Sequence, residues 1–357
     1  MLDSRAEDFR NRGRVHVVIR SCADSAHKVM IFQVPHPTHK MLKRVLCSLT
    51  FLLLTNASIS LAQQAPQPPS DQAELNELIR RAAIKMKEYE AGFKDLTAEE
   101  EQTSEEYDDK GKIEKQRRIS SDLFIYQSQL DPSAMVEYRD VKSVDGAPVK
   151  KREARLVNLL AKSAKADSLK KEMDRIQRES QRYDLRNSFY GMTLNQGLPL
   201  GEKTRQAFQF TLAGREQVNG HDAIVVDYQQ VSPIPDFNSD LRGLPAPLKG
   251  AEVVFRGRLW LDAETAQIRR EVRDLTLRLP SLTHLLVLYS FDLAYADSRF
   301  GFLTPKRIAI TLNTRGRTGA DKKPVTMLGG KITFDYGAFI RFAVDSPDAS
   351  IEPPKKP

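Results

Sequence analysis

Residues 71–93 carry the clearest hydrophobic pattern in the chain. Asp71 and Glu74 stand in capping-box spacing at its start. Apolar side chains then recur every three or four positions, the spacing of one helix face. They are Leu75, Leu78, Ile79, Ala82, Met86, Tyr89 and Phe93. The pattern predicts a helix that begins at Asp71 and packs its apolar stripe on a sheet.

Much of the remaining chain predicts β-strands, because apolar and polar residues alternate in short runs between turn signals. Asn219-Gly220 is the strongest hairpin signal among these turns. The predicted strands cover residues 96–107, 113–126, 135–144, 147–149, 208–212, 214–218, 223–229, 252–261, 268–279, 285–295, 306–313 and 331–344. This order predicts one large curved antiparallel sheet.

A charged insert, residues 151–183, interrupts the strands with a helical pattern. The pattern weakens over residues 162–167, so one helix and two helices are equally compatible with it. The chain is therefore expected to form a single α+β domain over residues 71–345. Residues 63–70 form a Pro/Gln linker, and residues 346–357 are expected to be a disordered tail.

Residues 41–62 have the three parts of a secretory signal peptide. Lys43 and Arg44 give a basic start, an apolar run follows, and Ser60 and Ala62 are the small residues before a cleavage site at Ala62–Gln63. The apolar run is too short to span a bilayer comfortably. We expect a periplasmic or secreted protein without an integral membrane span. Residues 1–40 are interpreted as a mis-assigned extension, with an atypically long signal as the alternative.

Composition narrows the classes of function. The whole chain has a formal net charge of +8, but after removal of residues 1–62 there remain 46 Lys and Arg against 43 Asp and Glu, a net charge of +3. Such a balance argues against a nucleic-acid-binding protein. Cys22 and Cys47 both lie in the removed part, so the mature protein has neither disulfides nor thiol chemistry.

Catalytic and cofactor motifs are absent from the sequence: it has no nucleophile elbow, HExxH motif, P-loop or GxGxxG motif. His221 and His284 are the mature histidines, and His221 is expected to be exposed after its turn. The glutamates of residues 99–106 are interpreted as a solvated strand face or a guarded sheet edge rather than a cation site. We expect no metal, no cofactor and no enzymatic activity.

Several predicted strands have one strongly apolar face, which must be covered. The covering is either the helices, giving an ordinary core, or partly a hydrophobic ligand. The candidate ligand-binding residues are Val253, Phe255, Val287, Tyr289, Phe291, Tyr295, Phe334 and Tyr336.

The hairpin around Trp260-Leu261-Asp262-Ala263-Glu264-Thr265 resembles that of the periplasmic lipoprotein carriers and outer-membrane lipoprotein-sorting proteins, the LolA-like superfamily. The hairpin of residues 214–228 and the Phe-x-Tyr-Gly-x-Phe pattern of residues 334–339 agree with it. The resemblance implies an unclosed half-barrel lidded by helices around an apolar cavity for acyl chains. The helical insert departs from that pattern.

Two hypotheses follow from these observations. The first is an exported, non-enzymatic protein that binds a lipid or an acylated protein in the half-barrel. The second is a structural or protein-interaction module of the cell envelope, with a solid core and the insert as its docking surface.

The signal peptide gives a testable start site. N-terminal sequencing of protein recovered outside the cytoplasm should read Gln-Gln-Ala-Pro, because cleavage after Ala62 leaves Gln63 first. Peptides from residues 3–39 in that material would overturn both the start site and the export.

Overall fold

The structure is a computed structural model that describes residues 14–23, 26–35, 69–94, 96–128, 130–131, 134–163, 165–185, 189, 191–194, 196–234, 238–239, 252–278, 285–318 and 323–341. Side chains are described from residue 71 onward, apart from 160, 238–239, 314–318 and 323–326. The predicted signal peptide, its cleavage site, His284 and the C-terminal tail lie outside these residues.

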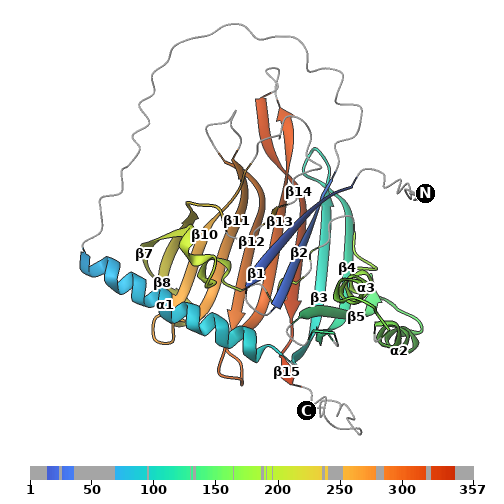
Figure 1. The fold of residues 1–357 in the computed structure, drawn as a ribbon. Helices are drawn as coiled ribbons and strands as arrows, with labels where there is room; N and C mark the ends of the chain where they lie inside the picture. Colours follow the sequence, from blue (N-terminus) through green and yellow to red (C-terminus); the bar gives the residue numbers. More distant parts are fainter. Residues whose placement is uncertain are drawn as a thin grey trace, which may run out of the picture.

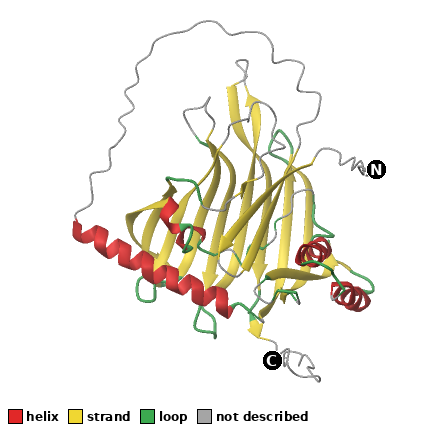
Figure 2. Cartoon of the chain, in the orientation of Figure 1, coloured by secondary structure: helices red, strands yellow, loops and turns green. Residues whose placement is uncertain are grey.

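One large antiparallel sheet dominates the fold (Figures 1 and 2). Its strand order is β6-β5-β4-β3-β14-β13-β12-β11-β10-β8-β7, with β15 on β3. The strands are β3 (Leu96–Tyr107), β4 (Ile113–Gln127), β5 (Met135–Val144), β6 (Ala147–Pro148), β7 (Phe208–Val218), β8 (His221–Gln230), β10 (Glu252–Asp262), β11 (Ile268–Arg278), β12 (Leu286–Ala296), β13 (Thr304–Thr318), β14 (Lys323–Tyr336) and β15 (Ile340–Arg341). The ends, β6 and β7, do not pair, so the predicted α+β half-barrel is confirmed.

Two sequential meanders make up this sheet. The first runs from β3 to β6 and the second from β7 to β14. They join where β14 pairs with β3, from Gly330↔Glu106 to Tyr336↔Glu100. The predicted strand 331–344 is wrong at residues 337–339, because the chain leaves the sheet at Gly337 and returns as the short β15; residues 342–344 lie outside the described residues.

Helix α1 (Pro69–Gly92) crosses the concave face near one end of the strands (Figure 1). The whole predicted apolar stripe is buried. The helix starts two residues before Asp71, with Pro69 in the first position, where a missing N–H costs nothing. Asp71 therefore lies in the first turn, where its negative charge favours the helix dipole.

The insert forms two helices, α2 (Arg152–Ser163) and α3 (Leu169–Ser180). They cover the other face of the sheet, at β4 and β5 (Figure 1). Leu159 and Ile176 pack there with Val136 and Tyr138, so β5 is buried on both faces. Ser180, the last residue of α3, also bonds to the backbone of β5: its Oγ accepts a hydrogen bond from Arg139 N, 3.2 Å away.

Residues before the predicted signal peptide form a hairpin, which the sequence pattern had not indicated. β1 (Arg14–Ala23) pairs with β2 (Ala26–Pro35), and β1 also pairs with the two-residue β9 (Asn238–Ser239). In the described part of the chain, no helix is long and apolar enough to cross a membrane.

The packing of α1 predicts a large loss of stability on Phe93→Ala. Phe93 is fully buried, 4.9 Å from the Tyr89 ring and 5.2 Å from the Phe339 ring. Removing a buried phenyl group costs about 3–5 kcal/mol. Urea unfolding should show this loss, whereas Ile84→Ala on the exposed side of α1 should change stability by under about 0.5 kcal/mol. Equal effects of the two changes would contradict the placement of α1.

Candidate functional site: the concave face and its cover segment

The concave face is closed by an irregular stretch of chain as well as by α1. We define the cover segment as residues 189–207, of which 190 and 195 are not described. The helical elements among its described residues are two single 3₁₀ turns, η2 (Leu198–Leu200) and η3 (Arg205–Ala207). Its buried apolar side chains are Phe189, Met192, Leu194, Leu200 and Ala207, all in the main core.

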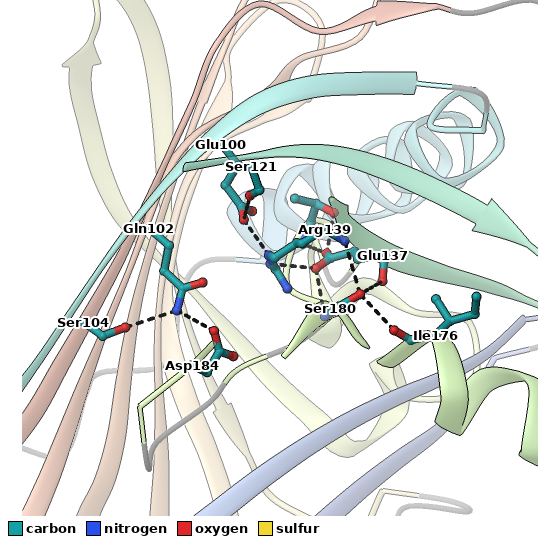
Figure 3. Close-up of polar contacts among 11 residues, drawn as sticks. Glu100, Gln102, Ser104, Ser121, Glu137, Arg139, Ile176, Ser180 and Asp184 are labelled. Carbon is teal, nitrogen blue, oxygen red and sulfur yellow. Dashed lines mark hydrogen bonds and ion pairs between the residues drawn. The ribbon is translucent and has the colours of Figure 1, made fainter. Parts of the chain in front are cut away.

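One attachment of the cover segment is the buried carboxylate of Glu137 on β5 (Figure 3). It accepts hydrogen bonds from Gly191 N at 3.0 Å, from Thr193 N at 2.6 Å and from the Thr193 hydroxyl. Arg139, two residues along the same face of β5, donates to it at 3.0 Å and to Glu100 on β3 at 2.5 Å. The cluster is therefore two carboxylates around one guanidinium, all nearly without solvent contact.

The second attachment lies across the half-barrel, on β11. Glu271 Oε2 accepts a hydrogen bond from Gly197 N at 3.1 Å, and Oε1 accepts one from the Tyr228 hydroxyl at 2.9 Å. Arg273, again two residues on, donates to both oxygens at 2.8 and 2.7 Å. The cover segment is thus held between two Glu-x-Arg pairs, which lie on the same concave face but on two strands far apart in the sheet, β5 and β11.

Glycine is needed at two positions of this site. Gly197 has φ +60, and a Cβ there would lie 2.8 Å from Ile268 Cδ1. At Gly257 on β10, a Cβ would lie 2.5 Å from the Tyr228 hydroxyl. The missing side chain leaves room for Tyr228 to reach Glu271.

Burial and charge set the titration of these groups. Burial raises the pKa of Glu100, and the attraction of Arg139 offsets this only in part. Burial opposes the charge on Arg139, but Glu100 and Glu137 outweigh it and raise its pKa. Burial, followed by the charges of Glu100 and Glu137, raises the pKa of Tyr336. A neutral Glu100 is therefore favoured over a wider pH range than an exposed glutamate.

The structure contradicts one part of the interpretation of the glutamates of residues 99–106, the sheet edge, and agrees with the other part, a solvated strand face, at Glu99 and Glu101. β3 lies between β14 and β4, so it is not a sheet edge. Glu100 points into the core with no exposed surface, whereas Glu99 and Glu101 on the other face are exposed. His221 agrees with its expectation: its side chain is 43% exposed and lies 3.2 Å from Asp297.

The candidate ligand-binding residues are mostly core residues in this structure. Phe255, Tyr289, Phe291, Tyr295, Phe334 and Tyr336 are buried in one cluster, and Val253 packs against it partly exposed. Phe189 of the cover segment fills the space over the centre, 5.5 Å from the Tyr289 ring and 6.0 Å from the Phe291 ring. Val287 lies outside this cluster, because a register shift between β11 and β12 breaks the alternation there.

The two Glu-x-Arg pairs had not been predicted as site residues. The sequence does contain a signal for them, because the two charged residues occupy strand positions whose neighbours on the same face are apolar. On β11, Glu271 and Arg273 lie on the same face as Leu275 and Leu277. The partners, the N–H groups of Gly191, Thr193 and Gly197, leave no such signal because they are backbone groups.

Comparison with known proteins gives a distant similarity of fold. No family model and no curated protein matches the chain. A DUF1329 family protein from Desulfovibrio piger has a TM-score of 0.31 at 12% identity, covering 77% of this chain and 96% of that chain. A putative outer membrane lipoprotein-sorting protein domain from Vibrio parahaemolyticus has a TM-score of 0.30 at 10% identity, covering 75% and 94%.

A LolA superfamily protein from Nitrosomonas europaea is also similar, with a TM-score of 0.28 at 6% identity, covering 74% of this chain and 91% of that chain. The similarity to LolA-like proteins predicted from the Trp260 hairpin is thereby confirmed as a distant one. At these values it says nothing of what the chain binds.

The raised pKa of Glu100 makes a pH-dependent prediction for Glu100→Gln. A group whose pKa is raised by folding stabilises the protein below its unfolded value, and this contribution is lost as pH rises through the folded value. The stability of the variant relative to the wild type should therefore increase as the pH rises above the ordinary pKa of a glutamate. Urea unfolding at several pH values measures it.

Glu101→Gln is the matched control, since it removes an exposed carboxylate from the other face of the same strand. A relative stability of Glu100→Gln that falls with pH, after comparison with this control, would contradict the buried cluster.

Proposed function

We propose that the protein is an exported, non-enzymatic binding protein. It holds the apolar part of a lipid or of an acylated protein on the concave face of the half-barrel, in place of the cover segment. The observation that carries the proposal is that the aromatic face of β12 is covered by an irregular segment, with Phe189 seated on Tyr289 and Phe291. A ligand chain that replaced Phe189 would meet the same apolar surface.

The attachments of the cover segment support such an exchange. It is held on two carboxylates by three backbone N–H groups and the Thr193 hydroxyl, and the Tyr89 hydroxyl donates to Thr193 O at 2.6 Å. Glu137 and Glu271 each have an arginine on their own strand as a further partner. Hydrogen bonds to a carboxylate require defined geometry, so a small displacement weakens them together. The segment therefore has one well-defined seated position and no continuous helix to unfold when it leaves.

A second candidate function rests on a different observation. The six core residues named above are in contact with one another and with the cover segment, which is what a solid interaction module requires. In that case the docking surface would be the exposed side of the insert, where Val157 on α2 is 65% exposed. Other side chains of the insert, such as Leu159 and Ile176, pack on the sheet, so deletion of the insert would also remove these contacts. A point substitution at Val157 therefore tests docking better.

Phe189→Ala separates the two functions. If the cover segment gives way to a ligand, removing its central ring should tighten the binding of a fluorescent fatty acid by about tenfold, since less apolar contact must be displaced. Phe339→Ala is the matched control: it removes another buried core ring, near the end of α1. Titration of the probe into the purified, delipidated proteins measures the affinities.

Native mass spectrometry after incubation with an envelope lipid extract identifies the bound species. No saturable probe binding and no lipid adduct, in either the wild type or Phe189→Ala, would contradict ligand binding and leave the solid interaction module as the better description.

A further inference from the structure

The outer face of the sheet carries a depression that the proposed function does not use. It lies opposite the cover segment, over β10 to β13, and the end of the β7–β8 hairpin forms one wall. Its volume is about 400 Å³. The lining includes Glu216, Trp260, Arg270, Asp292, Ala294 and Arg307.

Strand register explains why the depression exists. Trp260, Arg270, Ala294, Arg307 and Asp335 are direct neighbours in one row across β10, β11, β12, β13 and β14. Ala294 is the one short side chain in this row, and Ala309 lies in the next row beside Asp292. Two alanines among long charged side chains leave a gap in the outer face.

Two guanidinium groups stand on either side of that gap. Arg270 and Arg307 lie two strands apart, roughly 10 Å at the backbone. Arg270 donates to Asp292 through Nε and Nη2, at 2.9 and 2.8 Å, which leaves its Nη1 group without a partner among the described residues. Among the described residues, Arg307 has a single ion pair, of 3.6 Å to Asp335 on the side away from Arg270, and its side chain is 57% exposed.

Acceptors complete the lining. The carboxylates of Glu216 and Asp292 can take hydrogen bonds from hydroxyl groups, and Asn219 on the hairpin turn offers both a donor and an acceptor. The volume exceeds that of a bare anion and falls at the lower end of small-molecule sites. The chemistry is that of an anionic group next to a hydroxylated body.

We propose that this depression binds a small phosphorylated sugar or polyol. The phosphate lies over Ala294 between Arg270 and Arg307, because the planar guanidinium fork matches phosphate oxygens. The hydroxyl groups face Glu216 and Asp292. No bond is made or broken, so the site is a binding site. Its lining includes no residue of the cover segment.

The chain has a single tryptophan, which reports on this site directly. Trp260 is 6% exposed, its Nε1 donates to Glu216 at 2.8 Å, and the Arg270 guanidinium lies 4.8 Å from its ring centre. A phosphate that draws Arg270 toward it alters the environment of the indole. Titration of the purified protein with glucose 6-phosphate at constant ionic strength should therefore give a saturable change in tryptophan fluorescence.

Two variants and a control define the site. Arg307→Gln should weaken binding by about tenfold or more, the loss expected for a charge-assisted hydrogen bond. Ala294→Leu should abolish it by filling the floor. Arg256→Gln, which removes an arginine paired with Asp274 on the same outer face but outside the depression, should stay within about twofold of the wild type.

Unphosphorylated glucose should give no response. The proposal is overturned if glucose 6-phosphate gives no saturable change, if sodium chloride at equal ionic strength gives the same change, or if Arg307→Gln and Ala294→Leu bind as the wild type does. These measurements do not depend on the fatty-acid titration, so the proposal for this depression and the proposal for the concave face are tested separately.

Discussion

Two buried carboxylates, Glu137 and Glu271, determine how the interior of this half-barrel is arranged. A charged group in a dry core is tolerated only when it is paired and hydrogen-bonded. Each glutamate has an arginine two residues along its own strand, but one guanidinium does not satisfy all the acceptor positions of a carboxylate. The N–H groups of the cover segment supply the remainder. The path of residues 191–194 and 196–197 follows from this requirement as much as from apolar packing.

The two faces of the sheet use the same residue types in opposite ways. On the outer face, arginines and aspartates form cross-strand pairs in contact with water, such as Arg258 with Asp227, and each such pair adds little stability. On the concave face, Arg273 is almost completely buried, and loss of its partner would leave an uncompensated charge worth about 3–5 kcal/mol. Whether a pair of opposite charges in these strands is exposed or buried therefore depends on which face of the sheet its strand positions point to.

Periodic patterns predicted the elements well and their irregularities poorly. β3 and β5 have the predicted bounds, although only β3 alternates in burial over most of its length and β5 is buried on both faces. Val287 was wrongly grouped with Tyr289 because a one-residue register shift reverses the inward and outward positions, and nothing in the local sequence marks it. Glu100 was misjudged because its burial comes from strand order: β14, more than two hundred positions later, pairs beside it. The sequence also did not indicate on which face of the sheet the helical insert packs, because this depends on tertiary contacts.

The pairing of β3 with β14 also has a consequence for how the chain folds. Each meander consists of neighbouring strands that can pair as they are made, but the contact between them joins the first strand of the sheet to one of the last. Such long-range closure raises the contact order and slows folding. Until residues 330–336 are available, β3 has one bare edge and the buried charges beside it lack their dry environment. Completion of the sheet therefore requires residues 330–336, and it cannot occur before this late part of the chain has been synthesised.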